Sequence, residues 1–389
     1  MAVSNDLSND RRVARHAGAL QQAGCEVVVV GRRLPSSPEV EAPWRLVRMP
    51  LRHRRGWRFY AELNRRLCST MLRERPDVVW ANDTDTLAGC AVAARRLGCR
   101  LVMDAHELFP EVPEVQHRPL VQWVWRAIER RYMPRCDARL TVCQSIADYY
   151  RDRYGLAMTV VRNLPALRSP LSAPHSPLSA LRSPLSAPHS PLSAPHSPLS
   201  TLRSPLSTLL YQGAVNLGRG VDWAIDALEY LPQCRLVVAG RGDLLQAMQT
   251  YAAAKPWADR VHFLGHVPPA DLDALTRQAD VGLVMLDDLG LSYHYALPNR
   301  IGDFVAAGVP MVVSDLPEMA AVVRRFGVGE VIERQPGSEA RALARAVERV
   351  LARQWTDADF AAARRDMDWE REKQKLLAIL ITQKQTTQK

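Results

Sequence analysis

The stretch LGLSYHYALPNRIGDFVAAGVPMVVSDLP, residues 289–317, decides the fold, because a polar loop runs into a short helix and the helix runs into a strand. Pro298 and Asn299 are typical of a helix start, since proline fits the first turn and asparagine caps free amides. The helix expected over residues 300–307 ends at Gly308, which is soon followed by a proline. The run MVVSD then has the composition of a parallel strand buried on both faces. The stretch predicts an α/β sheet protein.

The polar side chains at the start of this helix indicate an anion site. A helix N-terminus at the carboxyl end of a parallel sheet attracts anions, and Arg300 adds charge in the first turn. We expect a phosphate on the amides of residues 299–301 and a ribose diol on Asp303, one turn further along. These two groups together describe a nucleotide. The alternative interpretation is an ordinary αβ unit in which Asn299 is only a helix cap.

The stretch resembles the donor-binding segment of the family 4 retaining glycosyltransferases of the GT-B fold, in which a PN(K/R)xx(E/D) run is found. The resemblance implies two Rossmann-like, doubly wound parallel-sheet domains that face each other across a cleft. It implies that Asn299 and Arg300 bind the donor diphosphate and that Asp303 binds the ribose. Many members carry two acidic residues spaced eight apart, whereas this chain has Tyr295 at the first position, so we expect Tyr295 in the cleft or acceptor site.

The length of 389 residues exceeds what one hydrophobic core usually serves, so we expect two domains, residues 1–165 and 209–354. The resemblance implies that residues 355–389 form a helix that crosses back to the first domain, with a tail. No window of 18 apolar residues and no secretory signal is found, so we expect a cytoplasmic protein. The seven cysteines show no CxxC and no Cys/His pair at metal spacing, which predicts neither disulfides nor zinc.

The net charge of +10 is concentrated in the first half of the chain. Residues 1–165 hold 27 arginines, no lysine and 18 acidic residues, so this half favours an anionic partner. The densest part, residues 45–66, interleaves Trp57, Phe59 and Tyr60 with arginines. Such a segment can lie on an anionic membrane surface, bind an acceptor with a phosphate, or be a solvated basic face. No motif supports nucleic-acid binding.

The N-terminus predicts the opening of a Rossmann-like half, with a helix over residues 11–23 and a buried strand over 25–30. The run DRRV, residues 10–13, resembles the DxRV run that opens many family members, which implies that Arg12 faces the inter-domain cleft. Further on, NDTDT at residues 82–86 has the DxD spacing of a divalent-metal site. We interpret it as capping the helix 87–97, since nothing nearby supplies further oxygen ligands.

His106 lies in the run DAHELFPE, residues 104–111, directly after a predicted strand. A side chain at the carboxyl end of a parallel strand projects into the crevice where α/β sheets bind ligands. A lone histidine is more often structural. The run, however, resembles the active-site histidine segment of the family, which implies that His106 lies near the transferred sugar. We interpret Glu107 and Glu111 as helix caps and not as catalysts.

Residues 169–210 are six tandem heptapeptides of the type SPLSxxx, a low-complexity repeat. Prolines in every unit exclude a coiled coil, and the few leucines bury too little surface. We therefore expect a disordered, polyproline-leaning linker over residues 166–208. A neutral expansion would be tolerated there, because loop length costs little free energy. Binding of a partner to the proline motif is the alternative.

The second half opens on a strand and the glycine-rich turn GAVNLGRG, residues 213–220. Glycines let the backbone approach a phosphate, and Arg219 supplies charge. The fingerprint GxGxxG is absent, which argues against a dehydrogenase. The turn resembles the YQGxxxxxRG segment of the family, which implies that Arg219 binds the diphosphate, although Ala214 stands where a second basic residue is common. The later run FLGHV resembles the family's FLGxV loop, which implies that Val267 contacts the nucleobase.

These observations predict a glycosyltransferase of the hexosyltransferase type, with a nucleotide-diphosphate sugar as donor and a glycan or lipid-linked acceptor. We expect no metal and no cofactor, because Arg219, Arg300 and helix amides would stabilise the leaving diphosphate. The resemblance implies retention of configuration, and the basic segment suggests association with the inner face of a membrane. One rival is a nucleotide-sugar epimerase or hydrolase of the same fold. The other is an inactive nucleotide-sugar-binding relic, favoured by Ala214, Tyr295 and the repeats.

Overall fold

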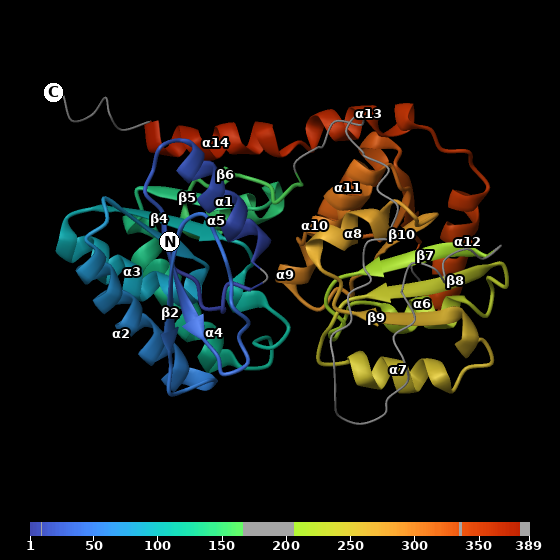
Figure 1. The fold of residues 1–389 in the computed structure, drawn as a ribbon, viewed down its shortest axis with the longest axis horizontal. Helices are drawn as coiled ribbons and strands as arrows, with labels where there is room; N and C mark the ends of the chain where they lie inside the picture. The colour runs from blue at the N-terminus through green and yellow to red at the C-terminus, as the bar shows by residue number, and fades with distance from the viewer. Residues whose placement is uncertain (9, 166–205, 334–336, 382–389) are drawn as a thin grey trace, which may run out of the picture.

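The computed structural model describes residues 1–8, 10–165, 206–333 and 337–381. The predicted repeat linker lies almost wholly outside these residues. The described residues form two bodies, each built on its own parallel sheet and lying side by side (Figure 1). The predicted α/β class, with two doubly wound parallel sheets, is confirmed.

The N-terminal sheet is a layer of short apolar strands. Its strands are β1 (Val28–Arg33), β2 (Arg45–Pro50), β3 (Val78–Asn82), β4 (Arg100–Ala105), β5 (Ala138–Thr141) and β6 (Thr159–Val160). Parallel pairing joins β1 to β2 and, separately, β3 through β6 in order. Ala2 bridges Val30 of β1 and Ala81 of β3, so residues 1–3 stand in the place of a central strand.

Helices cover both faces of this sheet because successive strand side chains point to opposite sides. On one face lies α1 (Arg11–Gln22), whose Val13, Ala17 and Leu20 pack on Val29 and Val102. The other face is covered by α2 (Gly56–Glu74), α3 (Thr84–Leu97), α4 (Pro119–Tyr132) and α5 (Gln144–Tyr154).

The basic segment 45–66 is therefore not one amphipathic element. It comprises β2, a loop and the first half of α2. Its aromatic residues are divided, since Phe59 is buried in the core while Trp57 is exposed to solvent. Only part of the segment can face a partner.

The C-terminal sheet has six parallel strands in the order β12-β11-β10-β7-β8-β9. They are β7 (Ser207–Gln212), β8 (Cys234–Ala239), β9 (Val261–Gly265), β10 (Val281–Val284), β11 (Met311–Ser314) and β12 (Gly329–Ile332). The helices are α6 (Val221–Ala227), α7 (Leu245–Ala253), α8 (Pro269–Thr276), α9 (Leu291–His294), α10 (Asn299–Ala307), α11 (Pro317–Phe326) and α12 (Glu339–Leu351). The strand order reverses between β7 and β10, and such a switch point is where open α/β sheets bind ligands.

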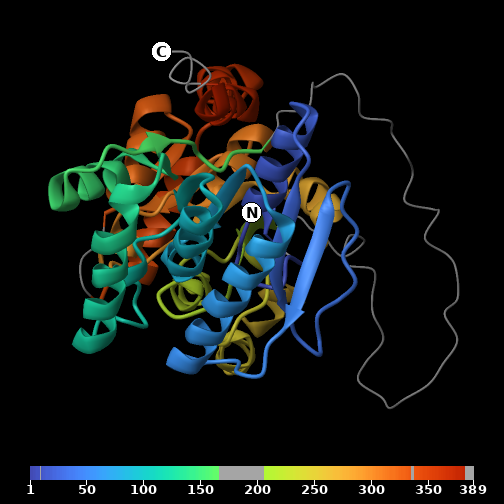
Figure 2. The same ribbon diagram turned by 90° about the vertical axis from the view of Figure 1, so that its left-hand side faces the viewer.

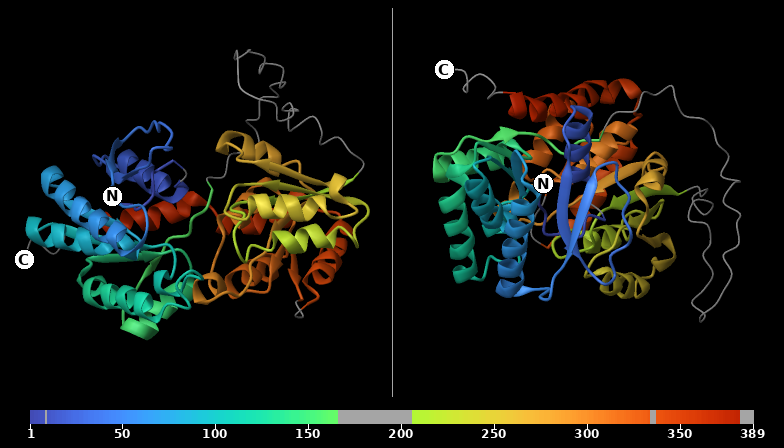
Figure 3. Two further views of the ribbon diagram at one scale, coloured as in Figure 1. Left: turned by 90° about the horizontal axis from the view of Figure 1, so that it is seen from below. Right: turned by 60° about the vertical axis from the view of Figure 1, so that its left-hand side comes forward.

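The chain returns to the N-terminal body at its end. A first helix, α13 (Asp357–Asp366), packs on α10 and α11, and a second, α14 (Trp369–Ile381), packs on α1. Figure 3 shows this crossing, and Figure 2 shows α14 end-on at the top of the N-terminal body. The Trp369 ring stacks on His16 at 5.8 Å and is buried in the N-terminal core.

Two further contacts fix the crossing. The Arg162 guanidinium donates to Glu372 in α14 and to Asp366 at the end of α13. The single crossing helix expected within residues 355–389 is two helices in the structure, α13 and α14. No helix in the described residues is both long and apolar enough to cross a lipid bilayer.

Replacing Trp369 with alanine should lower the free energy of unfolding by about 3–5 kcal/mol, because the change empties a packed aromatic site. Urea denaturation followed by circular dichroism measures this loss. Trp123→Ala is the matched control, since Trp123 is 66% exposed and its loss should cost under about 0.5 kcal/mol. Equal losses in the two variants would contradict the packing of α14 described above.

Candidate active site

The glycine-rich turn, residues 213–220, joins β7 to α6 at the switch point of the C-terminal sheet. Gly213 has a φ of +135°, which favours glycine. The turn also lies against the loop after β8, so closely that a Cβ on Gly240 would come within 1.7 Å of the Gly213 carbonyl oxygen. These glycines allow two backbone turns to stack at the carboxyl edge of the sheet, where a phosphate can approach the backbone.

Arg300 is hydrogen-bonded to the backbone next to this turn. Its guanidinium donates to the carbonyl oxygens of Gln212 (3.0 Å) and Met285 (3.2 Å), and its central carbon lies 4.7 Å from the centre of the Tyr211 ring. Burial lowers the pKa of Arg300, and the charge of nearby Arg219 lowers it further. Arg300 therefore holds together the ends of β7 and β10. Its binding of a diphosphate stays a prediction.

Arg219 lies at the end of the same turn, half-buried, with its guanidinium carbon 4.7 Å from the centre of the Tyr293 ring. No carboxylate of the described residues comes within ion-pair distance of Arg219 or Arg300. The two guanidinium groups are close enough to repel each other, so the site has an excess of positive charge. This charge suits an anion such as a diphosphate.

Helix α10 adds unpaired backbone donors to this positive region. Pro298 is the N-cap residue, and no side chain caps the helix. The prediction that Asn299 caps the helix is wrong, because Asn299 is already the first helical residue and is exposed. The Ile301 amide donates to the carbonyl oxygen of Pro298 at 3.0 Å, so the amides of Asn299 and Arg300 are the ones left for a ligand.

Asp303 lies one turn further along α10, where the two bodies meet. Its carboxylate accepts from the side-chain amide of Gln212 (3.2 Å) and from Arg11 of α1 in the N-terminal body (3.3 Å). Burial raises the pKa of Asp303. A ribose bound to the Asp303 carboxylate would share this carboxylate with Arg11 or displace Arg11 from it. The binding of a ribose by Asp303 stays a prediction.

The prediction that Arg12 faces the cleft is wrong. Arg12 is buried, donates through Nε and Nη2 to the Asp104 carboxylate, and donates through Nη1 to the carbonyl oxygen of Val161. Successive residues of a helix point about 100° apart. Arg11, not Arg12, therefore reaches the other body, and the DxRV resemblance alone did not distinguish them.

His106 lies at the carboxyl end of β4 between two carboxylates. Its Nδ1 is 3.2 Å from Asp83 and its Nε2 is 3.2 Å from Asp104. Burial by itself would lower the pKa of His106, but the two carboxylates outweigh it and raise the pKa to about 10. The imidazole is therefore positively charged at neutral pH, with both ring nitrogens turned to carboxylates, so it can stabilise negative charge but cannot act as a base.

Asp83 is a site residue that sequence reasoning missed. The predicted capping role is wrong, because α3 begins at Thr84 and the Asp83 side chain makes no capping bond. It instead accepts from the backbone amide of His106 at 2.7 Å. Asp83 also has a φ of +62°, which is uncommon outside glycine and is often found at functional sites. The signal in the sequence that could have identified Asp83 is an acidic residue directly after β3, the strand next to the one that ends just before His106.

The His106 segment and the glycine-rich turn face each other. Glu107 is exposed to solvent and lies within range of the charges of both Asp83 and Arg219, which come from the two bodies. Burial and nearby Asp83 raise the pKa of Glu107, while the charge of Arg219 from the opposite body opposes this rise. One crevice therefore contains His106 and Arg219.

The remaining predicted residues lie at the edges of this crevice. Val267 follows β9, half-buried against the C-terminal core, at the same sheet edge as the glycine-rich turn. Tyr295 packs on the N-terminal core, and its carbonyl oxygen accepts from the Cys143 thiol. Tyr295 thus contributes to packing between the bodies. The nucleobase contact of Val267 stays a prediction.

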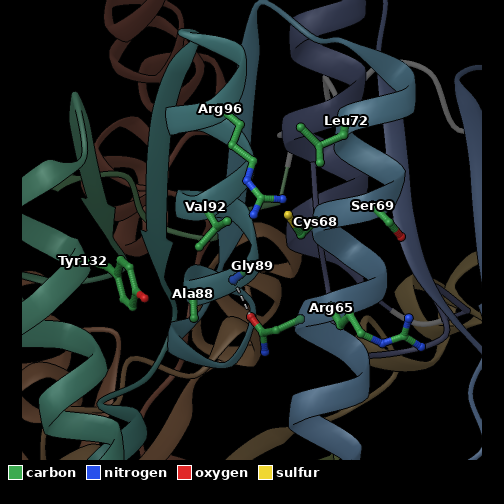
Figure 4. A pocket seen from close by; sticks show the side chains of 10 residues that line it. Arg65, Cys68, Ser69, Leu72, Ala88, Gly89, Val92, Arg96 and Tyr132 are labelled. Atoms are coloured by element: carbon green, nitrogen blue, oxygen red, sulfur yellow. Dashed lines mark hydrogen bonds between the residues drawn. The ribbon is translucent and has the colours of Figure 1, made fainter.

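Two cavities lie elsewhere in the N-terminal body. A groove of about 420 Å³ runs between α2 and α3, with Ala88, Gly89 and Val92 of α3 along it (Figure 4). A second cavity of about 360 Å³ lies at the ends of β1 and β2 and is lined by Arg32, Arg33, His53 and Arg54, among others. Neither contains His106 or Arg219. Within the described ranges, no group of three His, Cys, Asp or Glu side chains is placed to hold a metal ion.

The two bodies match family models separately. Residues 10–164 match the model described as Glycosyltransferase Family 4, and residues 207–353 match Glycosyl transferases group 1. These two matches, on two bodies that each carry a parallel sheet, define a glycosyltransferase of the GT-B fold. The chain belongs to family 4 of these glycosyltransferases.

A phosphatidyl-myo-inositol mannosyltransferase of Mycobacterium leprae (strain TN) is 30% identical over 168 residues. The match covers 39% of this chain and 40% of that protein, less than half of its length. Sucrose-phosphate synthase from Thermosynechococcus elongatus has a similar structure, with a TM-score of 0.72, 18% identity, and coverage of 95% of this chain and 91% of that one. Anabaena HepE in complex with UDP and glucose gives a TM-score of 0.69 at 15% identity, with 98% of each chain covered.

Replacing Asp83 with asparagine should lower the pKa of His106, since one of its two carboxylates becomes neutral. Histidine NMR titration of the wild type and the variant measures the change directly. Asp288→Asn is the control, because Asp288 pairs with exposed His294 instead. An unchanged His106 titration in Asp83→Asn would contradict the assigned geometry.

The same pKa gives stability a defined pH dependence. Because the pKa of His106 rises from 6.5 to about 10 on folding, its ion pairs stabilise the fold fully below pH 6.5. This contribution is lost as the pH rises towards 10. The difference in urea midpoint between wild type and His106→Gln should therefore shrink across that interval, and a constant difference would contradict a charged His106.

Proposed function

We propose that the protein transfers a sugar from a nucleotide-diphosphate donor to a glycan or lipid-linked acceptor, without a metal and with retention of configuration. The observation that carries the proposal is the convergence of Arg219, Arg300 and the uncapped first turn of α10 on one side of a crevice, with His106 on the other. Such a concentration of fixed positive charge and amide donors is suited to a diphosphate. Asp303, one turn along α10, is placed for the ribose of the same ligand.

In the proposed reaction, the bond between the anomeric carbon and the donor phosphate oxygen breaks and the nucleoside diphosphate leaves. The acceptor oxygen bonds to the anomeric carbon on the same face, and its proton passes to the departing phosphate. Arg219 and the amides of α10 stabilise the charge that develops on the diphosphate. His106, being cationic, acts near the sugar through its positive charge, because both of its ring nitrogens face carboxylates.

The acceptor is proposed to carry negative charge or to lie at an anionic surface. The support is the net positive charge of the N-terminal body and its arginine-rich α2 region. A peripheral position on the inner face of a membrane fits this charge. The M. leprae relative is named for a phosphatidylinositol substrate, which supports testing lipid acceptors first.

Two other functions share the donor site. A nucleotide-sugar epimerase or hydrolase of this fold would act on the donor with no acceptor present, so product analysis with donor alone separates it. A binding relic would bind the donor in calorimetry and turn over nothing. Thermal-shift screening of UDP-, GDP-, TDP- and ADP-sugars comes first, starting with UDP-glucose, which HepE binds in a solved structure.

Arg219→Ala should lower kcat by at least about tenfold, because one donor to the leaving group is removed. Steady-state release of nucleoside diphosphate measures this. Arg219 is a cleaner test than Arg300, whose loss would also break two hydrogen bonds within the fold. Arg324→Ala removes an exposed arginine of the same body and is the control. Near wild-type turnover in Arg219→Ala would refute the assigned donor site.

Chelation should leave turnover unchanged, because arginines and amides replace a metal in the proposal. The measurement compares initial rates before and after exhaustive treatment with EDTA, with Mg²⁺ and Mn²⁺ added back. A loss of activity that a divalent cation restores would overturn the metal-independent part of the proposal and leave the fold assignment intact.

A further inference from the structure

Helix α4 presents an apolar face that no other part of the described chain covers. Leu120 is 79% exposed and Trp123 66%, and Val121 and Val124 are exposed beside them. The opposite side of the helix, with Trp125 and Glu129, is buried in the N-terminal body. Large apolar side chains that gather on one exposed face mark an interaction site.

The first turn of α2 extends this face. Tyr60 of α2 contacts Trp125 of α4, with ring centres 4.8 Å apart. Trp57 lies one turn before Tyr60 and Val121 one turn before Trp125, so both are one turn away from the Tyr60–Trp125 contact. Trp57, Leu120, Val121, Trp123 and Val124 form what we call the docking face. They are five of the eight large hydrophobic side chains exposed in the described residues.

Arginines surround the docking face. Arg54 and Arg55 precede Trp57, Arg58 follows it, and Arg118 precedes α4, all of them exposed. None of these four has an acidic partner within ion-pair distance in the part of the chain that the structure describes. Among the described residues close to them in sequence, the exposed acid is Glu114, so positive charge predominates.

A cavity at the ends of β1 and β2, just before α2 in the chain, offers basic side chains to an anion. It is lined by Arg32, Arg33, His53 and Arg54 and has a volume of about 360 Å³. The Glu62 carboxylate lies 3.0 Å from His53 Nδ1 and also accepts the backbone amides of Arg52 and His53. These bonds to Glu62 fix the loop of residues 51–54, which forms one wall of the cavity. The basic side chains of this loop are therefore held at the edge of the docking face.

We infer that the docking face binds the surface of an anionic lipid membrane. Tryptophan and leucine side chains enter the interfacial region, and arginines around them pair with lipid phosphates. A second copy of the chain fits less well, because a symmetric contact would bring two sets of unpaired arginines together.

The docking face lies at the rim of the active-site crevice. Helices α2, α3 and α4 all begin at the carboxyl edge of the N-terminal sheet, where Asp83 and His106 lie. The loop before α4 touches the C-terminal body, since a Cβ on Gly290 would come within 1.9 Å of the Gln116 side chain. A membrane at this face would present a lipid-linked acceptor to His106. This step deepens the proposed function and rests on it for the identity of the acceptor.

The test is co-sedimentation of the full chain with vesicles. Vesicles of phosphatidylcholine with phosphatidylglycerol should bind the wild type at low salt, and vesicles of phosphatidylcholine alone should bind it far more weakly. The double variant Leu120→Ser with Trp123→Ser should lose about tenfold in affinity, because two inserted side chains are removed. Tyr230→Ser, an exposed aromatic of the other body, is the control and should bind as the wild type does.

Charge is tested separately with Arg54→Gln and Arg55→Gln, which should weaken binding to the anionic vesicles and reduce its salt dependence. Failure of the wild type to bind either vesicle, or equal binding by the Leu120/Trp123 variant, overturns the inference. A wild-type dimer that the variant converts to a monomer, with no vesicle binding by either, overturns it in favour of self-association.

Donor binding separates this inference from the proposed function. Nucleotide-sugar thermal shifts should be the same in the wild type and the Leu120/Trp123 variant, which also shows that the variant is folded. Vesicle binding without any donor binding would refute the proposed function and leave the docking face intact. Donor binding and turnover on a water-soluble acceptor, without vesicle binding, would refute the docking face alone.

Discussion

The buried carboxylate of Asp104 holds the active-site side of the N-terminal body together. A buried charge is costly unless it is paired, and Asp104 is paired with Arg12 while His16 and His106 lie 3.2 Å from it. Burial alone would raise the pKa of Asp104, but the charges of Arg12 and His106 together hold it well below its usual range. The carboxylate stays ionised and keeps His106 charged.

Helix α1 connects the buried Asp104 carboxylate to the C-terminal body and to α14. Arg12 points inward to Asp104, whereas Arg11 reaches Asp303 in the other body. His16 lies between Asp104 and Trp369 of the crossing helix, and burial lowers its pKa to about 4, so it is neutral. One helix therefore contacts the Asp104 carboxylate that lies beside His106, the C-terminal body and α14. A movement of one body relative to the other would change the contact between Arg11 and Asp303, because Arg11 is the residue of α1 that reaches the C-terminal body.

Cationic groups dominate the crevice itself. His106 carries a positive charge on one side, and Arg219 and Arg300 carry charges on the other, with no carboxylate of the described residues paired to either arginine. The charge of His106 is balanced by Asp83 and Asp104, whereas Arg219 and Arg300 repel each other with no carboxylate of the described residues paired to them, which favours a bound anion beside the two arginines. A diphosphate that enters this crevice removes that repulsion, which is the physical basis for a donor site without a metal.

Local patterns predicted much of this molecule. Strand and helix periodicity, proline and glycine positions and charge distribution identified the parallel α/β bodies and the α10 segment, since these depend on near neighbours in the sequence. The partners of individual polar side chains did not follow from the sequence. Arg12 and Arg11 are adjacent in the same motif, and only the helix rotation separated the buried residue from the one in the crevice. Asp83 looked like a cap until the pairing of β3 with β4 placed it against His106. The sequence did not show which apolar side chains of α4 are exposed, because this depends on the opposite face of the helix being packed against the N-terminal body. Periodicity along a chain determines which secondary-structure element forms. Residues that are distant in sequence and that the fold brings together decide which face of that element is buried and which charged groups lie next to it.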